Sequence, residues 1–282
     1  NQINKKNYIK LFPTAYISYS LDDNNNFSLN YSRRIQRPAF WELNPAKWYT
    51  NLNFINYGNP FLQPSFSHNF ELNYNYKNRL NTGFWLSKTD GESGQLTINQ
   101  NENIILSIRE NFANTLSAGC TEYFYFTPYT WWSITSTLNI YYASNNTISP
   151  YLNAQYSGWG GDLNITDTFN LNTSKSLSAE IIYNYDFPNK YAYDTRQGRT
   201  NLDIGLKYNM LYKKLKFNLF FSDLLGSYKT IGTRNTQGIL YTFNIYNDTR
   251  SVRFSINYTF GNNTIKIDKR EGGNADERKR SN

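Results

Sequence analysis

The chain has few of the side chains on which enzyme and metal chemistry usually depends. Its 282 residues include one cysteine, Cys120, and one histidine, His68. A single cysteine excludes an internal disulfide, and one histidine with one cysteine leaves no ligand set for structural zinc. A Ser-His-acid arrangement would have to use His68, and Ser65 and Ser67 are its neighbours in sequence only. We therefore predict no catalytic residue, no metal site and no cofactor.

Long apolar runs are absent as well, since none approaches the ~20 residues of a spanning helix. The mean hydropathy is low, at −0.68, yet aromatic residues make up 18% of the chain, with 25 Tyr, 19 Phe and 6 Trp. Tyr and Asn alternate instead of separating into a core and a surface. Strands with lipid on one side and water on the other need this mixture. A soluble β-sandwich or a secreted β-repeat is the alternative.

The segment from Ser251 to Gly261 shows the alternation without a break. Polar residues occupy the odd positions and apolar ones the even positions. A strand points successive side chains to opposite faces, so the segment has one apolar and one polar face. Its length suits a tilted strand that crosses a bilayer. We predict a closing strand with these side chains toward lipid: Val252, Phe254, Ile256, Tyr258 and Phe260.

The same pattern recurs along the chain, and short and long connections alternate between the segments. Short turns fall near residues 24, 78, 129, 173 and 213, and longer loops near 50, 96, 147, 193 and 230. Short periplasmic turns and long extracellular loops are typical of outer-membrane barrels. The fold class is therefore predicted as all-β, a transmembrane antiparallel up-and-down β-barrel of which about 11–12 strands are present.

The pattern near the C-terminus allows two arrangements of strands. Residues 240–246 and 251–261 are expected to form either one tall strand or a hairpin turned at Asn247-Asp248. Counting them as one strand gives an odd number, whereas complete single-chain barrels have an even number. We therefore expect residues 1–261 to be the C-terminal part of a larger outer-membrane barrel. Residues 262–282 are expected to form a charged, flexible periplasmic tail.

A formal net charge of +8 is often a sign of a protein that binds nucleic acid. Lysines and arginines are scattered singly along polar strand faces and loops, however, and the only cluster is the tail. We expect no nucleic-acid partner, and we assign the charge to the lumen and to attraction by anionic lipid headgroups. Ordinary solvation of a wet interior is one explanation of the predicted lumen charges, which are Glu71, Arg109, Asp203, Lys207, Lys216 and Arg253.

An irregular stretch, about residues 35–67, interrupts the strands. Its prolines argue against regular strand, and its aromatics argue for a folded loop. The runs Ser32–Pro38, Phe40–Pro45 and Gly58–Pro64 closely resemble the outer-membrane β-barrel family of Bacteroidota, the barrel part of TonB-dependent-receptor-like proteins. Ser222–Leu225 and Tyr258–Gly261 resemble later segments of that family more weakly. The family-motif loop comprises Ser32, Arg33, Arg34, Arg37, Pro38, Trp41, Asn44, Pro45, Gly58, Asn59, Pro60, Leu62 and Pro64. Ser65 departs from the pattern, since members usually carry an acidic residue there.

The resemblance implies a longer parent chain with a plug inside a barrel of 22 strands. Docking of that plug is the other explanation of the predicted lumen charges. It implies a receptor-like, non-enzymatic protein of the bacterial outer membrane that binds or takes up a solute. The expected partners are outer-membrane lipid, the plug of the same parent chain, and TonB or a surface lipoprotein. The alternatives are a passive porin or a structural barrel of an envelope complex without TonB-driven transport, and an outer-membrane enzyme that uses His68.

Overall fold

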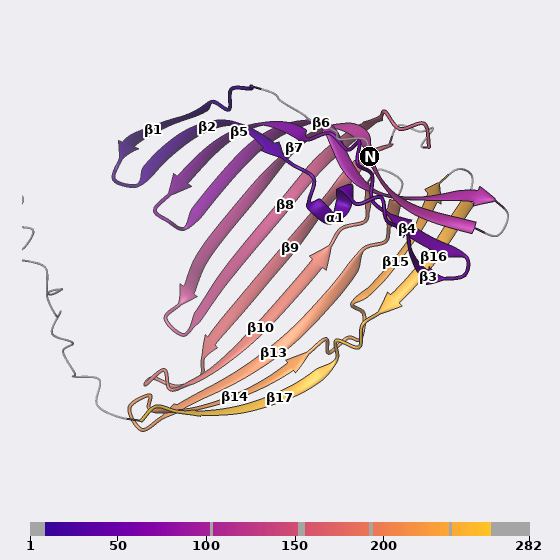
Figure 1. Ribbon diagram of the computed structural model, residues 1–282. Helices are drawn as coiled ribbons and strands as arrows, with labels where there is room; N and C mark the ends of the chain where they lie inside the picture. The colour runs from indigo at the N-terminus through magenta and orange to yellow at the C-terminus, as the bar shows by residue number, and fades with distance from the viewer. Residues whose placement is uncertain (1–8, 102–103, 152–155, 192–193, 237–238, 261–282) are drawn as a thin grey trace, which may run out of the picture.

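The structure is a computed structural model that describes residues 9–101, 104–151, 156–191, 194–236 and 239–260. It is almost entirely β (Figure 1). Eleven strands form one continuous wall: β1 (Thr14–Asp22), β2 (Asn25–Gln36), β5 (Ser65–Tyr76), β6 (Leu80–Asn101), β7 (Ile104–Tyr129), β8 (Trp132–Thr147), β9 (Tyr156–Asn170), β10 (Leu177–Asp186), β13 (Arg199–Met210), β14 (Leu215–Ser222) and β17 (Ser251–Tyr258). The remaining elements lie in the connections: α1 (Phe40–Leu43), β3 (Trp48–Asn51), β4 (Phe54–Tyr57), β11 (Asn189–Tyr191), β12 (Asp194–Arg196), β15 (Lys229–Thr236) and β16 (Ile239–Tyr246).

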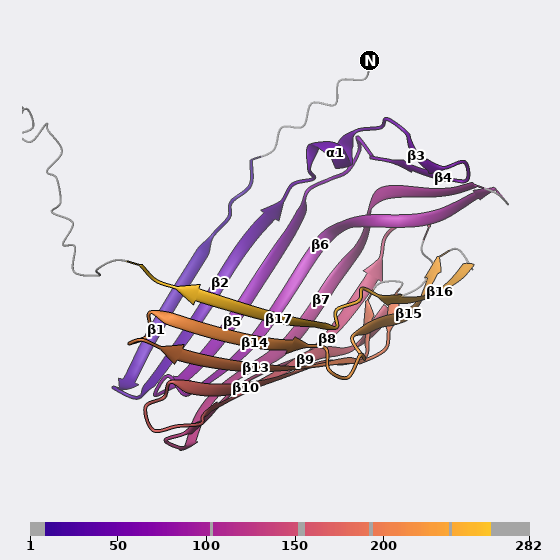
Figure 2. The same ribbon diagram turned by 90° about the horizontal axis from the view of Figure 1, so that it is seen from below.

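The wall is an antiparallel meander that curves into an open trough (Figures 1 and 2). Each wall strand pairs with the next, from β1 at one edge to β17 at the other. Within the described residues β1 pairs only with β2, and β17 pairs only with β14. The two edge strands do not meet, so the barrel is not closed here. The short turns lie where the sequence predicts them, and the predicted up-and-down fold class is confirmed.

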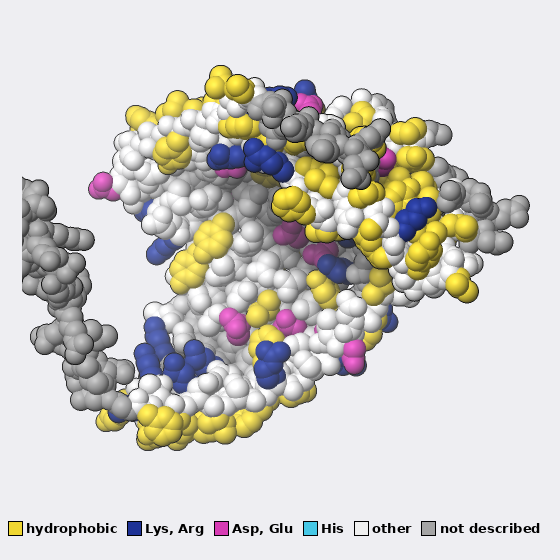
Figure 3. Space-filling model, viewed as in Figure 1, with side chains coloured by type: hydrophobic (Ala, Val, Ile, Leu, Met, Phe, Trp, Pro, Cys, Tyr) yellow, Lys and Arg dark blue, Asp and Glu magenta, His cyan; other side chains and the backbone are white. Residues whose placement is uncertain are grey.

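The two faces of the wall differ as the alternation predicts. On β17 the exposed fractions of Val252, Phe254 and Ile256 are 67%, 60% and 56%. In Figure 3 hydrophobic side chains follow the outer rim, and charged side chains lie in the hollow. An apolar outer face and a polar inner face are what a barrel wall between lipid and water requires.

β6 and β7 extend far past the other wall strands. The longer loop expected near residue 96 is therefore wrong, because β6 continues to Asn101 and pairs with β7 as far as Ile104. Bulges near Gly91 and Glu92 change the register where the extension leaves the wall. Such bulges bend and twist a strand pair.

The main buried cluster lies in this extension. β4 adds to it in parallel, with Phe54 beside Ile105 and Tyr57 beside Ile108. Leu96 is completely buried there. The buried cluster comprises Ile55, Leu96, Ile98, Leu106, Ile108, Phe112 and Ala113. We call the part of β6 and β7 from residue 90 to 113, together with β4, the extension.

A second, four-stranded sheet has the order β11-β12-β15-β16. Its strands come from the β10–β13 and β14–β17 connections, both of which are on the long-loop side. The Asp194 carboxylate is 6% exposed and accepts hydrogen bonds from Arg234 Nε and Nη2 at 2.6 and 2.8 Å. This bidentate pair joins β12 to β15.

The predicted placement of residues 240–246 and 251–261 in one tall strand or one hairpin was also wrong. β16 pairs with β15, whereas β17 pairs with β14 in the wall. The chain crosses between the two sheets at residues 247–250. Thr249 Oγ1 donates a hydrogen bond to the buried carboxylate of Asp223 at 2.7 Å, and Arg250 Nη2 donates to Leu224 O at 2.7 Å. These contacts fix the crossing, and they give the Ser222–Leu225 segment a structural role.

In the described part of the chain no helix has the length and apolar character needed to cross a membrane. The expected tail, residues 262–282, lies outside the described residues, as does Gly261.

Candidate ligand-facing mouth and lumen

The family-motif loop folds inward over the hollow of the wall at the long-loop end (Figure 1). Backbone hydrogen bonds hold its two halves together. Gly58 N–H donates to Asn44 O at 2.8 Å, and Asn59 N–H donates to Glu42 O at 2.7 Å. A Cβ atom on Gly58 would lie 2.7 Å from Asn44 O. Only glycine lets the two segments approach this closely.

Side chains then fasten the loop to β7. The Asn111 side chain accepts a hydrogen bond from Gln63 N–H at 2.8 Å and donates to Gln63 O and Gly91 O at 2.9 and 2.7 Å. Leu62 is 2% exposed beneath the loop. Gly58, Asn59 and Leu62 of the motif therefore serve the loop structure. Ser65, where the family usually has an acid, is buried at the start of β5.

Arg109 is the predicted lumen charge that lies in the extension. Its Nη1 is 3.5 Å from Glu42 Oε1, and its guanidinium carbon is 4.6 Å from the centre of the Trp41 ring. Glu42 also accepts a hydrogen bond from Ala39 N–H at 2.8 Å. Arg109 therefore holds α1 against β7, while the Trp41 side chain stays 54% exposed.

The remaining motif residues lie around this loop. Ser32, Arg33 and Arg34 are in β2, and their alternation puts Arg33 on the outer face with Tyr31. Asn44 Oδ1 accepts a hydrogen bond from Ala46 N–H at 3.0 Å across Pro45. Arg37 and Pro38 follow the end of β2, and Pro60 and Pro64 flank Leu62 before β5.

A row of polar side chains crosses the inner wall below the mouth. Asn139, Asp162, Asp186 and Arg199 occupy successive paired positions on β8, β9, β10 and β13. Asn139 Nδ2 donates to Asp162 at 3.3 Å. Arg199 Nε forms a 2.5 Å ion pair with Asp186, and Arg199 Nη1 donates to Thr230 at 2.8 Å. The row thus links the wall to the second sheet.

This row borders a cavity of about 180 Å³ where the wall meets the second sheet. Asp162, Asp186, Arg196 and Arg199 bring both signs of charge to it, and Tyr141 adds an aromatic surface. The cavity can therefore offer hydrogen-bond donors, acceptors and one ring face to a polar ligand. The Asp186–Arg199 pair was not predicted from the sequence. The alternation along β10 does put Asp186 on the inner face, but it does not show that Arg199 lies opposite.

Flat aromatic side chains cover glycines farther along the same wall. Trp85, Gly119, Tyr141 and Gly160 are successive paired positions from β6 to β9. A Cβ atom on Gly160 would lie 2.6 Å from the Tyr141 ring, and the Trp85 and Tyr141 ring centres are 6.3 Å apart. The glycines let these rings lie against the wall.

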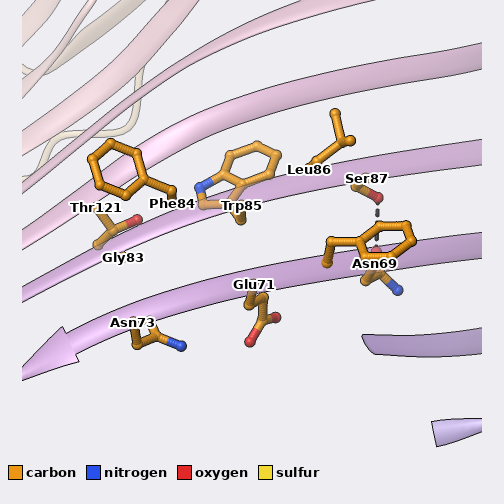
Figure 4. Close-up of a pocket in the computed structure, with 10 residues that line it drawn as sticks. Asn69, Glu71, Asn73, Gly83, Phe84, Trp85, Leu86, Ser87 and Thr121 are labelled. Atoms are coloured by element: carbon orange, nitrogen blue, oxygen red, sulfur yellow. Dashed lines mark hydrogen bonds between the residues drawn. The ribbon is translucent and has the colours of Figure 1, made fainter. Parts of the chain in front are cut away.

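Glu71, the first predicted lumen charge, lies on β5 beside this aromatic row. Figure 4 shows it near Trp85, with the hydrogen bond of 2.8 Å from Ser87 to Asn69 close by. Asn30 Nδ2 donates to Glu71 at 3.3 Å. A cavity of about 350 Å³ is lined by residues of β5, β6 and β7 at this point, Glu71 and Trp85 among them.

The basic predicted charges gather on the opposite part of the wall. Lys207 pairs across with Asn218, Lys216 with Asn257, and Arg253 with Phe220. Among the described residues these cations have no ion pair. Asp203 differs, because it accepts a hydrogen bond from Asp223 N–H at 2.8 Å and so belongs to the crossing near Thr249.

His68 does not form a hydrolytic site with its serine neighbours. Its Nδ1 is 2.9 Å from the Tyr31 hydroxyl on the outer face, whereas Ser67 has the opposite parity on β5. In the described ranges no group of His, Cys, Asp and Glu could hold a metal ion.

The chain matches a known protein family. The model of the outer membrane protein beta-barrel family matches residues 1–258. The chain belongs to this family. It lies in the bacterial outer membrane, as family members do. No curated protein sequence matches it.

This chain resembles solved siderophore receptors in fold. PirA from Pseudomonas aeruginosa matches with a TM-score of 0.57 at 14% identity, over 76% of this chain and 39% of that one. PirA from Acinetobacter baumannii matches with a TM-score of 0.50 at 11% identity, over 76% of this chain and 37% of that one. A PfeA mutant from Pseudomonas aeruginosa matches with a TM-score of 0.50 at 14% identity, over 76% of this chain and 35% of that one. The chain thus spans less than two fifths of the length of these receptors.

Proposed function

We propose that the chain forms part of the wall and mouth of an outer-membrane receptor that binds a solute and takes it up without enzymatic conversion. The observation that carries the proposal is the charged cavity at the long-loop end, between the inner wall and the second sheet. Ligands that reach the cell from outside would meet this end first. The likeness in fold to siderophore receptors supports the same role.

The rest of the receptor would come from a longer parent chain of Bacteroidota type. Further strands would pair with the free edges of β1 and β17 to complete a barrel of about 22 strands, a number within the known range. A plug would fill the lumen, where Glu71, Lys207, Lys216 and Arg253 would face it. TonB would supply energy from the periplasm, and a surface lipoprotein would cover the mouth. Residues 262–282 would extend into the periplasm as a charged tail.

A transport assay in a deletion strain tests the proposal. Cells that express the full-length gene are given radiolabelled ferric iron on a catecholate siderophore, and in parallel a set of labelled oligosaccharides and peptides. We expect one of these to accumulate only when the gene and TonB are both present. The double variant Asp186→Asn/Arg199→Gln should raise the concentration needed for half-maximal uptake about tenfold, because two charge-assisted contacts are removed. Lys77→Gln, at the short-turn end, is the control and should leave uptake unchanged.

Conductance separates the receptor from a passive porin. The full-length protein in a planar bilayer should show no steady open channel, because a plug would block the lumen. A stable ohmic conductance together with uptake that is independent of TonB would replace this proposal with a porin.

A further inference from the structure

The outer face of the wall carries an unexpected row of basic side chains at its long-loop end. Arg33, His68 and Lys88 are directly paired across β2, β5 and β6. All three share the parity of the lipid-facing residues, since Tyr31, Phe70 and Leu86 follow two positions farther along the same strands. Adjacent side chains in such a row have Cβ atoms about 5 Å apart.

A fourth basic side chain, Lys10, lies beside this row, and both Lys10 and Arg33 contact an aromatic ring. Lys10 Nζ lies 4.1 Å from the centre of the Phe66 ring, and the Arg33 guanidinium carbon lies 5.7 Å from it. Arg33 Nη1 donates a hydrogen bond to Leu11 O at 3.3 Å, whereas its Nε is shielded and has no hydrogen-bond partner within the described residues. The aromatic surface holds the cations side by side, although like charges repel one another.

The height of the row on the wall matches the boundary of the membrane. On β5 the lipid-facing series runs from Tyr76 at the short turn to His68, eight positions away. That is about 27 Å along the strand, or about 20 Å along the bilayer normal at the usual tilt, against an apolar band of about 25 Å. The row beneath it runs through Tyr31, Phe70, Leu86, Ala118, Tyr142 and Trp159. Its Tyr and Trp side chains are typical of the interface. The basic row therefore lies within about 5 Å of the outer edge of the apolar band, from where long basic side chains reach the headgroups.

We propose that Lys10, Arg33, His68 and Lys88 bind the phosphate groups of an outer-leaflet glycolipid headgroup on the outside of the barrel. Arg33 offers a planar fork for a phosphate, and Lys10 and Lys88 offer point charges. Within the described residues the cluster has one ion pair, between Lys88 Nζ and Asp90 at 3.7 Å, so it keeps an excess of positive charge. Phe12, Phe66 and Tyr31 would contact the sugar and the first methylenes of the acyl chains.

Binding of lipid A to the purified full-length protein tests this site. The probe is diphosphoryl lipid A in detergent micelles, followed by native mass spectrometry and by thermophoresis. The triple variant Lys10→Gln/Arg33→Gln/Lys88→Gln should bind it about tenfold more weakly, or worse, because charged contacts to phosphate are lost. Lys207→Gln, a lysine on the inner face, should bind like the wild type.

Further measurements identify the source of the phosphate and show whether each variant folds. Lipid A without phosphates should bind the wild type as weakly as diphosphoryl lipid A binds the triple variant, and inorganic phosphate should not compete at millimolar concentration. The single variant Lys88→Gln, whose side chain is 61% exposed, should fold normally and lose affinity in the same direction. Heat-modifiable gel mobility reports folding of every variant.

Unchanged binding of diphosphoryl lipid A by folded Lys88→Gln and triple variants would overturn the proposal. Equal binding of the lipid without phosphates would do the same, and competition by inorganic phosphate would show a site for soluble anions. None of these results bears on the solute receptor, because the site and the lumen lie on opposite faces of the wall.

Discussion

The membrane wall and the extension are built from the same alternating strands, but they bury their apolar side chains in different places. On β17 Val252, Phe254 and Ile256 are more than half exposed, so no protein element covers them in the described structure. In the extension Leu96 and Leu106 are covered by β4 and by neighbouring side chains. The same alternation of apolar and polar residues therefore occurs in both regions. They differ in whether another protein element covers the apolar face.

The largest effect should come from opening the protein-covered core. Leu96→Ala should destabilise the extension by about 2–5 kcal/mol, because a buried leucine leaves a cavity that closes only in part. Hydrogen exchange should show faster exchange of amides 90–113. Leu86→Ala, on the lipid face of the same strand, is the matched control. Equal exchange in both variants would contradict the distinction between the two regions.

A charge on the lipid face of the wall should cost almost as much. Phe254→Arg should destabilise the barrel by about 2–4 kcal/mol, since arginine would face hydrocarbon. Ser255→Arg, one residue along and toward the lumen, should cost far less. Urea unfolding of the full-length protein in lipid vesicles compares the two, and equal midpoints would mean that the faces are assigned wrongly.

A smaller effect is expected at the junction between the regions. Gly58→Ala would push a methyl group against the backbone of residues 42–44, at a cost of about 1–3 kcal/mol. The family-motif loop should then be cleaved faster by trypsin near Arg37 and Lys47. Gly83→Ala faces the flexible Asn73 side chain instead, and it should leave cleavage unchanged.

The smallest effect concerns pH, which should act on the extension and not on the wall. Burial raises the pKa of Glu110 above its ordinary value. The folded extension therefore holds the proton more tightly than the unfolded chain, so its stability is highest in acid. That stability decreases as the pH rises from the unfolded pKa of Glu110 through its folded pKa.

Glu110→Gln should remove this decrease and slow exchange of amides 104–112 slightly at pH 7, and hydrogen exchange at pH 4 and 7 measures it. Asn59 Nδ2, which donates to Glu110 at 3.3 Å, would still find an acceptor on the glutamine. A pH dependence that persists in the variant would assign it to another group.

Much of the wall could be predicted because its pattern is local. The alternation in residues 68–76, 177–185, 202–210 and 251–260 predicts which side chains share a face, and Asp22–Asn26 and Lys77–Arg79 mark turns by composition. The structure shows these turns and strands, whereas contact of the apolar face with lipid stays a prediction. The predicted lumen charges on β5, β13, β14 and β17 follow the same parity, whereas their contacts with a plug stay a prediction.

The extension and the second sheet could not be predicted in this way. β4 pairs with β7 although the two are far apart in sequence, and β4 has only four residues. Residues 89–101 are rich in Gly, Asn and Glu and look like a loop, but they pair with β7. Residues 239–246 alternate as a wall strand would, and their pairing with β15 depends on the crossing held by Asp223.

The sequence by itself determined the all-β class, the two faces of each wall strand, the short turns and the family, because each follows from a period of two residues or from a motif. Only the tertiary structure decided that Arg109 braces α1, that Asp186 and Arg199 meet at a cavity, and that Arg33, His68 and Lys88 form one row. Strand register decides such meetings. Register is set by hydrogen bonds between segments that are distant in the chain, and no local pattern contains it.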